Sequence, residues 1–136
     1  MFPLSLPSAK FPDSNFISNQ DKILCDVGGT GVVVTDPIDE GIKYLHGISG
    51  DCKVDAGPRV CSRVSCSYSA AIWLCNDTKE DLWIPCSKVG DYAQDIRDKC
   101  WFNASPGAPV WLPVVRGQEF DTENWNVILG SSPDHC

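Results

Sequence analysis

Apolar residues recur at helical spacing in two parts of the chain, and the first follows Asp36-Pro37. Ile38, Ile42 and Leu45 stand at i, i+4 and i+7, which places them on one side of a helix. We expect this helix to begin with Asp36 as its N-cap and Pro37 in its first turn. The glycine-containing segment HGISGDC should end it.

A second helix is predicted between two cysteines. Val89, Ala93, Ile96 and Cys100 follow the i, i+4, i+7, i+11 spacing. Cys86 and Cys100 are about four helical turns apart, so both thiols would project from the same side of one continuous helix. We therefore expect this helix to be bonded to the sheet at both ends.

The remaining apolar segments are typical of strands. A β-branched run starts near Ile23. The next strand region is GPRVCSRVSCSYSAAIWLCND, which is long enough for two strands or one bent strand. An antiparallel pair is predicted for VWLPVVRGQ and NWNVILG, which are joined across EFDTE. The segment that ends in SAAIWLC is apolar on both faces, so it should be central, and the face without helices must meet a loop, the N-terminal segment or a partner.

These elements predict an α+β fold, with two helices packed on an antiparallel sheet of about four strands. Residues 1–22 mix Pro, Ser and Asn with scattered Phe and follow neither period, so we interpret them as an extended or mobile arm. Residues 23–136 then form a single domain, as the length of the chain indicates.

The cysteines of the chain predict four disulfides. The chain has eight cysteines at irregular spacing, an even number typical of secreted proteins. It has no CxxC pair, and His46 and His135 are far apart, so we expect neither a metal site nor a cofactor. The cysteines are at positions 25, 52, 61, 66, 75, 86, 100 and 136.

Charge and hydropathy exclude two classes of partner. The formal charge of −7 and the lack of a basic stripe argue against nucleic acid and anionic membranes. No apolar run approaches the length of a membrane span. We expect a monomer that is secreted to the extracellular space, from which a signal peptide has already been removed.

The sequence contains no evident catalytic constellation. Carboxylates are the only abundant side chains that could take part in catalysis. We interpret Asp91, Asp95 and Asp98 as the solvated face of the second helix. His46 follows the first helix and fits a C-terminal helix residue better than a general base. We expect no enzyme activity.

Tryptophans in Pro-flanked segments are the first candidates for recognition. Trp83 in EDLWIPC and Trp111 in GAPVWLP are either lids on the core or exposed anchors for a protein partner, and loop aromatics of small domains favour the lid. With the RGQEFDTEN hairpin they form our candidate partner surface, which comprises Trp83, Trp111, Arg116, Gln118, Glu119 and Phe120.

Two short sequences match the glycosylation pattern. Asn76-Asp77-Thr78 follows the predicted central strand, and Asn103-Ala104-Ser105 precedes a proline that weakens the match. We name Asn76 and Asn103 as candidate glycosylation sites. A glycan at Asn76 would leave the neighbouring rim exposed to solvent.

Residues 59–136 contain four features in a characteristic order. These are the segment RVSCSYSAAIWL, an amphipathic helix bounded by cysteines, the segment VVRGQEFDTENWNVIL and a terminal Cys136. This layout resembles the killer-toxin family of the viral smut-fungus killer protein type. It is similar in architecture to small cysteine-rich effectors of plant-pathogenic fungi, including the Leptosphaeria avirulence-suppressing family. The effector resemblance implies a virulence or avirulence protein that binds a plant host protein, such as an immune receptor, outside host cells or after translocation into them.

The killer-toxin resemblance also implies a disulfide pairing, although eight cysteines allow about a hundred pairings and the sequence does not choose among them. A toxin-like pairing joins Cys25 to Cys100, Cys52 to Cys86, Cys61 to Cys75 and Cys66 to Cys136. The alternative function that it implies is a toxin that perturbs calcium flux in competing fungi through a basic residue ahead of the strand cysteine. Val64 stands two residues before Cys66, beside Arg63, so the lysine of that family is missing here.

Overall fold

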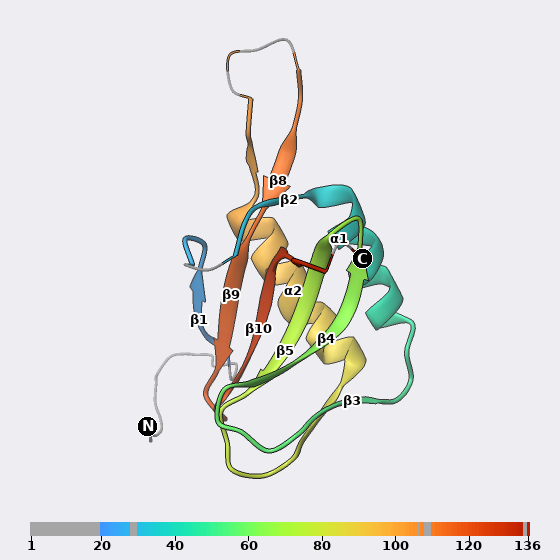
Figure 1. The fold of residues 1–136 in the computed structure, drawn as a ribbon, viewed down its shortest axis with the longest axis vertical. Coiled ribbons are helices and arrows are strands. Elements are labelled where there is room, and N and C mark those ends of the chain that lie inside the picture. The colour runs from blue at the N-terminus through green and yellow to red at the C-terminus, as the bar shows by residue number, and fades with distance from the viewer. Residues whose placement is uncertain (1–19, 28–29, 106, 108–109, 135) are drawn as a thin grey trace.

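A five-stranded antiparallel sheet forms the centre of the computed structural model, which describes residues 20–27, 30–105, 107, 110–134 and 136 (Figure 1). The strand order is β1-β9-β10-β5-β4. The two central strands are almost entirely buried, which explains why they are apolar on both faces. The strands are β1 (Gln20–Leu24), β4 (Val60–Ser67), β5 (Ala70–Asn76), β9 (Gly117–Asp121) and β10 (Trp125–Ser131).

Both helices pack on the same face of this sheet, as Figure 1 shows. α1 (Thr35–His46) covers β4 and β5, and α2 (Cys86–Cys100) covers β9 and β10. The predicted apolar stripes are confirmed as the buried sides of the two helices, because every member is at most 6% exposed. The stripes comprise Ile38, Ile42 and Leu45 in α1 and Val89, Ala93, Ile96 and Cys100 in α2.

The prediction of Asp36 as N-cap is wrong. α1 begins at Thr35, directly after strand β2 (Val33–Val34), and Val34 occupies the cap position without a side-chain hydrogen bond. Asp36 lies in the first turn, where its charge still complements the helix dipole. The helix ends at His46, and the Gly47 N–H donates to the carbonyls of Lys43 and Tyr44.

The predicted single sheet of about four strands is also wrong, because the connections form two further antiparallel sheets. One contains β2, β8 and β7 in that order, and the other pairs β3 with β6. These strands have only two to four residues, too short to show an alternating pattern in the sequence. They are β3 (Asp51–Val54), β6 (Leu82–Pro85), β7 (Phe102–Asn103) and β8 (Pro113–Val115).

The segment that the sequence left open as two strands or one is a hairpin. β4 and β5 are joined by Tyr68 and Ser69, which both have positive φ angles, 49° and 62°. Such a turn matches the twist of the strands that it connects, and it usually contains Gly or Asn. The absence of those residues explains why the sequence did not reveal it.

The sheet begins earlier than the predicted domain start at Ile23. β1 pairs with β9 from Gln20 onward, so the last residues of the predicted arm belong to the sheet. The rest of the predicted arm, residues 1–19, lies outside the described residues.

The structure contains four disulfides, and they join the same pairs that the toxin-like pairing implies. Cys100 at the end of α2 is bonded to Cys25, which follows β1, and Cys86 at the start of α2 is bonded to Cys52 in β3. Both ends of α2 are therefore covalently attached, as the spacing of its cysteines predicted.

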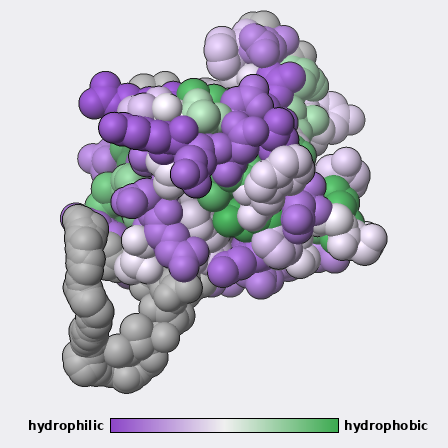
Figure 2. All heavy atoms as spheres, turned by 90° about the horizontal axis from the view of Figure 1, so that it is seen from below, coloured by the Kyte–Doolittle hydropathy of each residue, from purple (hydrophilic) through white to green (hydrophobic). Residues whose placement is uncertain are grey.

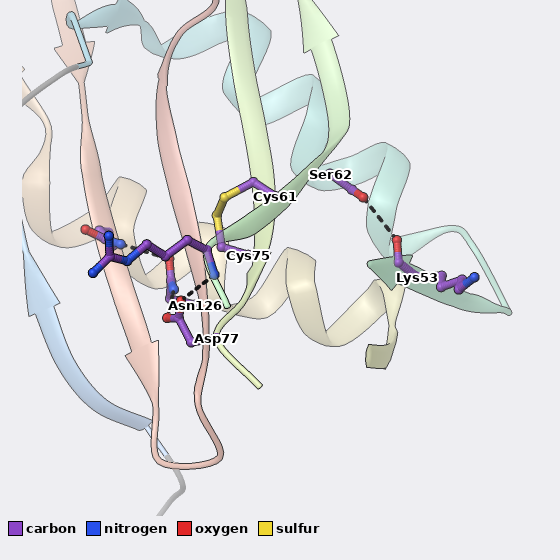
Figure 3. Close-up of a disulfide and its surroundings, with 8 residues drawn as sticks. Lys53, Cys61, Ser62, Cys75, Asp77 and Asn126 are labelled. Atoms are coloured by element: carbon purple, nitrogen blue, oxygen red, sulfur yellow. Dashed lines mark hydrogen bonds between the residues drawn. A yellow bond between two sulfur atoms is a disulfide. The ribbon is translucent and has the colours of Figure 1, made fainter. Parts of the chain in front are cut away.

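The face of the sheet without helices carries a third disulfide. Cys61 and Cys75 lie directly opposite each other on β4 and β5 (Figure 3). Near them Asn126 donates a hydrogen bond to Asp77 at 3.2 Å. Trp73 and Ile128 share this face and are half-buried. A loop and the C-terminal segment cover part of this face, because Thr30 lies against Gly130 and Arg63 is paired with Asp134.

Loop length predicts which disulfide contributes most to stability. Replacing Cys25 and Cys100 by Ala opens a loop with a sequence separation of 75 residues, against 14 for Cys61 and Cys75. The first change should lower the free energy of unfolding by about 4 kcal/mol and the second by about 3 kcal/mol, from chain entropy alone. Denaturant unfolding of the two double variants measures both values. Each pair has one buried cysteine, so the variants are matched, and an equal or reversed order would contradict the expectation.

Candidate partner-binding surface

The sheet formed by β2, β8 and β7 projects from one end of the molecule and exposes apolar side chains (Figure 1). Val34, Val114 and Phe102 lie side by side across its three strands. Val114 is buried between its neighbours, whereas Val34 is 40% and Phe102 48% exposed. Alternation along the strand puts Trp101 on the face opposite to Phe102, so the exposed apolar side chains lie on both faces of the hairpin. We call the whole exposed set the aromatic hairpin surface; its members are Val32, Val34, Trp101, Phe102, Val110, Trp111 and Leu112.

Hydrogen bonds fix the base of this hairpin. The Asn103 side-chain oxygen accepts bonds from the backbone N–H groups of Ser105 (3.2 Å) and Leu112 (3.0 Å). The Ala104 N–H donates to the Leu112 carbonyl at 2.8 Å. Cys100, bonded to Cys25, directly precedes Trp101. The exposed apolar side chains around this base are therefore presented on an anchored backbone.

Two tryptophans contact each other on this surface. The rings of Trp101 and Trp111 meet edge to face, with centroids 5.6 Å apart. Residues 101–115 contain no charged residue, although the chain as a whole carries a net charge of −7. Exposed aromatic side chains in an uncharged setting are typical of the centre of a protein interface. The opposite end of the molecule, seen in Figure 2, is mostly hydrophilic with smaller hydrophobic areas.

The prediction that Trp83 and Trp111 are lids on the core is wrong. Trp111 is 66% and Trp83 59% exposed. Trp83 lies on β6, where it alternates with the buried Ile84, and the Lys53 ammonium stands 5.3 Å from its ring centroid. Trp83 belongs to the sheet of β3 and β6, whereas Trp111 lies in the segment that leads into β8, so the two tryptophans lie on different elements of the fold.

The four residues proposed from the RGQEFDTEN hairpin are divided between two faces. Glu119 points toward α2 and is only 1% exposed, so it cannot contact a partner. The prediction that Glu119 belongs to the partner surface is therefore wrong. Gln118 and Phe120 are half-buried on the opposite face of the sheet, as the alternation along a strand requires. Arg116 donates to Asp26 and to the Thr30 carbonyl, so it holds a loop of its own chain.

Glu119 belongs to a buried acidic cluster between α2 and β9. Tyr92 of α2 is 2% exposed and donates a hydrogen bond to the carboxylate of Asp121, which is 5% exposed. The Asp95 carboxyl lies against Glu119, and no N–H or O–H donor among the described residues pairs with either Glu119 oxygen. Two carboxyl groups in contact share a hydrogen bond only when one is protonated. The interpretation of Asp95 as a solvated residue is therefore corrected.

Burial and the neighbouring carboxyl groups raise the pKa of Glu119 from 4.5 to about 8. Burial also raises the pKa of Asp121 and that of the Tyr92 phenol. The folded chain consequently holds a proton on Glu119 that the unfolded chain releases at neutral pH. No sequence pattern indicated this, since Glu119 lies in the segment GQEFD, in which Phe120 is the only large apolar residue.

The raised pKa of Glu119 predicts that this residue contributes most to stability in acid. Because the folded state binds the Glu119 proton more tightly, the free energy of unfolding should fall as pH rises from about 4.5 to about 8, by up to about 1.4 kcal/mol per pH unit. Denaturant unfolding at several pH values measures the slope. Glu119→Gln removes the titrating group and should flatten the slope, whereas the exposed Glu80→Gln should not. An unchanged slope in Glu119→Gln would contradict this assignment.

Asn76 is unsuited to carry a glycan, which corrects the sequence prediction. It is 0% exposed, and its Nδ2 donates to the carbonyls of Asp55 (3.0 Å) and Glu80 (2.7 Å). A glycan on that nitrogen would break these bonds and have no space. Asn103 is half-buried, and its Nδ2 has no hydrogen-bond partner within the described residues, so it stays a candidate site.

The protein secreted from a eukaryotic host should therefore carry at most one N-glycan, on Asn103. Intact mass before and after enzymatic deglycosylation gives the number of glycans. Asn103→Gln should carry none, because the buried amide of Asn76 is committed to the fold. A glycan retained on that variant would show that Asn76 is modified.

No catalytic arrangement was found around His46. Its Nε2 lies 2.9 Å from the Asp91 carboxylate, but both side chains are exposed, and the groove between α1 and β4 does not include them. Over the described part of the chain, no group of three His, Cys, Asp or Glu residues could hold a metal ion. None of the helices in that part is long and apolar enough to cross a membrane.

Comparisons with known proteins give no further assignment. No protein-family model, no curated protein and no solved structure matches the chain. The surface chemistry described above is therefore the basis for a functional hypothesis.

Proposed function

We propose that the chain is a secreted, non-catalytic effector of a plant-pathogenic fungus that binds a host protein through the aromatic hairpin surface. The observation that carries this proposal is the exposure of Trp101, Phe102 and Trp111 on an anchored, uncharged hairpin. Exposing such side chains to water is unfavourable, and a partner that covers them recovers the hydrophobic free energy.

The cellular setting follows from the disulfides. Four disulfides in a small domain are typical of secreted or extracellular proteins. The fungal and plant context comes from the resemblance to cysteine-rich effectors, with which the α+β architecture is compatible. The partner would be a plant protein, with immune receptors as one class, met outside host cells or after uptake into them. The effector itself would be a monomer.

Affinity capture from plant extracellular fluid and cell extract tests this function. Trp111→Ala removes the most exposed ring of the surface and should weaken capture of the bound host protein about 30-fold, as expected for a hot-spot aromatic. Tyr68→Ala is the matched control, because Tyr68 is 83% exposed in the β4–β5 turn and outside the surface. Both variants should retain the unfolding transition of the parent protein.

The proposal fails if Trp111→Ala captures the same host proteins as strongly as the parent chain does, or if Tyr68→Ala loses them equally. Loss in both variants would indicate non-specific adsorption through exposed aromatic rings. Loss in Trp111→Ala alone assigns the interaction to the hairpin.

A second candidate is a killer-type toxin, favoured by the disulfide pairing that the resemblance to that family implies. The basic residue that this function requires argues against it. Arg63, which lies nearest to the family position at Val64, donates to Asp134 at 2.8 Å and to Ser132 at 2.9 Å. Its charge is thus neutralised within the chain. Inhibition of fungal growth that added calcium relieves would favour the toxin over the effector.

A further inference from the structure

A groove of about 490 Å³ runs between α1 and β4, away from the aromatic hairpin surface. Its lining includes every residue from Arg63 to Ser67. Side chains alternate between the two faces of a sheet, so a groove on one face would be lined by every second residue. The unbroken run shows that the groove follows the edge of β4. Its other wall is formed by Glu40, Gly41 and Tyr44 of α1.

β4 is the terminal strand of the five-stranded sheet. In an antiparallel pair every second residue turns its backbone N–H and C=O away from its partner, so these groups of β4 face the groove. Within the described residues, no hydrogen bond from outside the β4–β5 ladder reaches the backbone of Arg63–Ser67. The segment Val64–Ser67 also lacks Lys and Pro, the residues that commonly protect a strand edge.

Only part of the edge is open, and within that part Cys66 is disulfide-bonded to Cys136. The other half of β4 lies against β3, where the Ser62 hydroxyl donates to the Lys53 carbonyl at 3.2 Å (Figure 3). A shift of register between Arg63 and Ser65 separates that half from the open part. The edge can therefore pair with only a few residues of another chain, which implies weak binding.

The wall formed by α1 determines which side chains fit. Gly41 lets the helix lie close to β4, because a Cβ at this position would be 2.5 Å from the Ser65 hydroxyl oxygen. Tyr44 is 60% exposed, and Glu40 has no ion-pair partner among the described residues. Arg63 is paired with Asp134. The unbalanced charge in the groove is thus negative.

The spacing of Glu40 and Tyr44 along α1 matches the spacing of alternate residues in an extended peptide. Glu40 and Tyr44 are separated by about one helical turn, about 6 Å along α1. Alternate residues of a strand are separated by about 6.6 Å and point to the same side. One peptide can therefore place two successive side chains of one face against Glu40 and Tyr44.

We propose that the groove binds an extended peptide, which adds to β4 as a further strand and places a basic side chain at Glu40 and an apolar side chain two positions away at Tyr44. The backbone bonds of such strand addition give affinity, and the two side chains give specificity. This site involves neither the aromatic hairpin surface nor the partner proposed for it.

The test uses an eight-residue probe peptide, acetylated and amidated, with lysine and valine two positions apart in a serine/threonine sequence. Titration into ¹⁵N-labelled protein should shift the amide signals of Val64–Ser67 and Glu40–Tyr44, with a Kd of about 0.1–1 mM. A probe with N-methylated backbone amides cannot donate to the β4 edge and should bind at least about tenfold more weakly.

Charge reversal tests the side-chain assignment. Glu40→Lys should weaken binding of the lysine probe about tenfold and restore binding of a probe with glutamate in place of lysine. Tyr44→Ala should weaken the lysine probe several-fold. Glu80→Lys and Tyr68→Ala are matched controls at exposed positions outside the groove, and neither should change the Kd.

Several results would overturn the proposal. These are failure of the lysine probe to bind, equal binding of the N-methylated probe, or signal shifts confined to other elements. A second copy of the chain is the competing occupant. Concentration-dependent shifts of the β4 amides without peptide, together with a dimer in sedimentation, would assign the edge to self-association.

Discussion

The disulfide between Cys25 and Cys100 fixes the point at which three parts of the molecule meet. It joins the end of α2 to the segment that follows β1, and the aromatic hairpin begins at the next residue, Trp101. Among the described residues of the hairpin, only Val114 and Val115 belong to the core, and most of the other apolar side chains are exposed. It therefore depends on this bond and on the hydrogen bonds of Asn103 for its position. Without such anchoring, exposed aromatic rings would fold back over the core or promote aggregation.

Charge is distributed unevenly over the molecule, and the distribution is consistent with protein recognition. The chain has 18 acidic residues, and none of them lies in residues 101–115. Inside the fold, Glu119 and Asp121 lie beneath α2, where burial raises the pKa of both carboxyl groups, and Asp95 of α2 lies against Glu119. A chain with this arrangement gains stability in acid, and its exposed apolar surface lies outside the acidic part. The pH dependence of stability and the exposed apolar surface are independent of each other, because the hairpin contains no titratable group.

Parts of the fold could be predicted because they depend on local periodicity. The apolar stripe of α2 and its two terminal cysteines were correct, since helical spacing alone places Val89, Ile96 and Cys100 on one side. The short sheets were missed because strands of two residues, such as β7, show no period. The helix start at Asp36 was wrong because a strand leads directly into α1 and leaves no capping loop.

The candidate site was predictable only in part, for a physical reason. The Pro-flanked segment of Trp111 left a lid and an exposed anchor as alternatives and favoured the lid, and the exposure of Trp111 depends on the strands beside it, which the sequence did not reveal. Glu119 was misplaced because alternation in a strand gives two faces and does not say which of them the helices cover. The sequence by itself determined the two helices, the antiparallel strands and the number of disulfides, since these follow from spacing and composition. The tertiary structure alone decided which carboxyl groups are buried and which strand edge is open, because both depend on contacts between residues far apart in the chain.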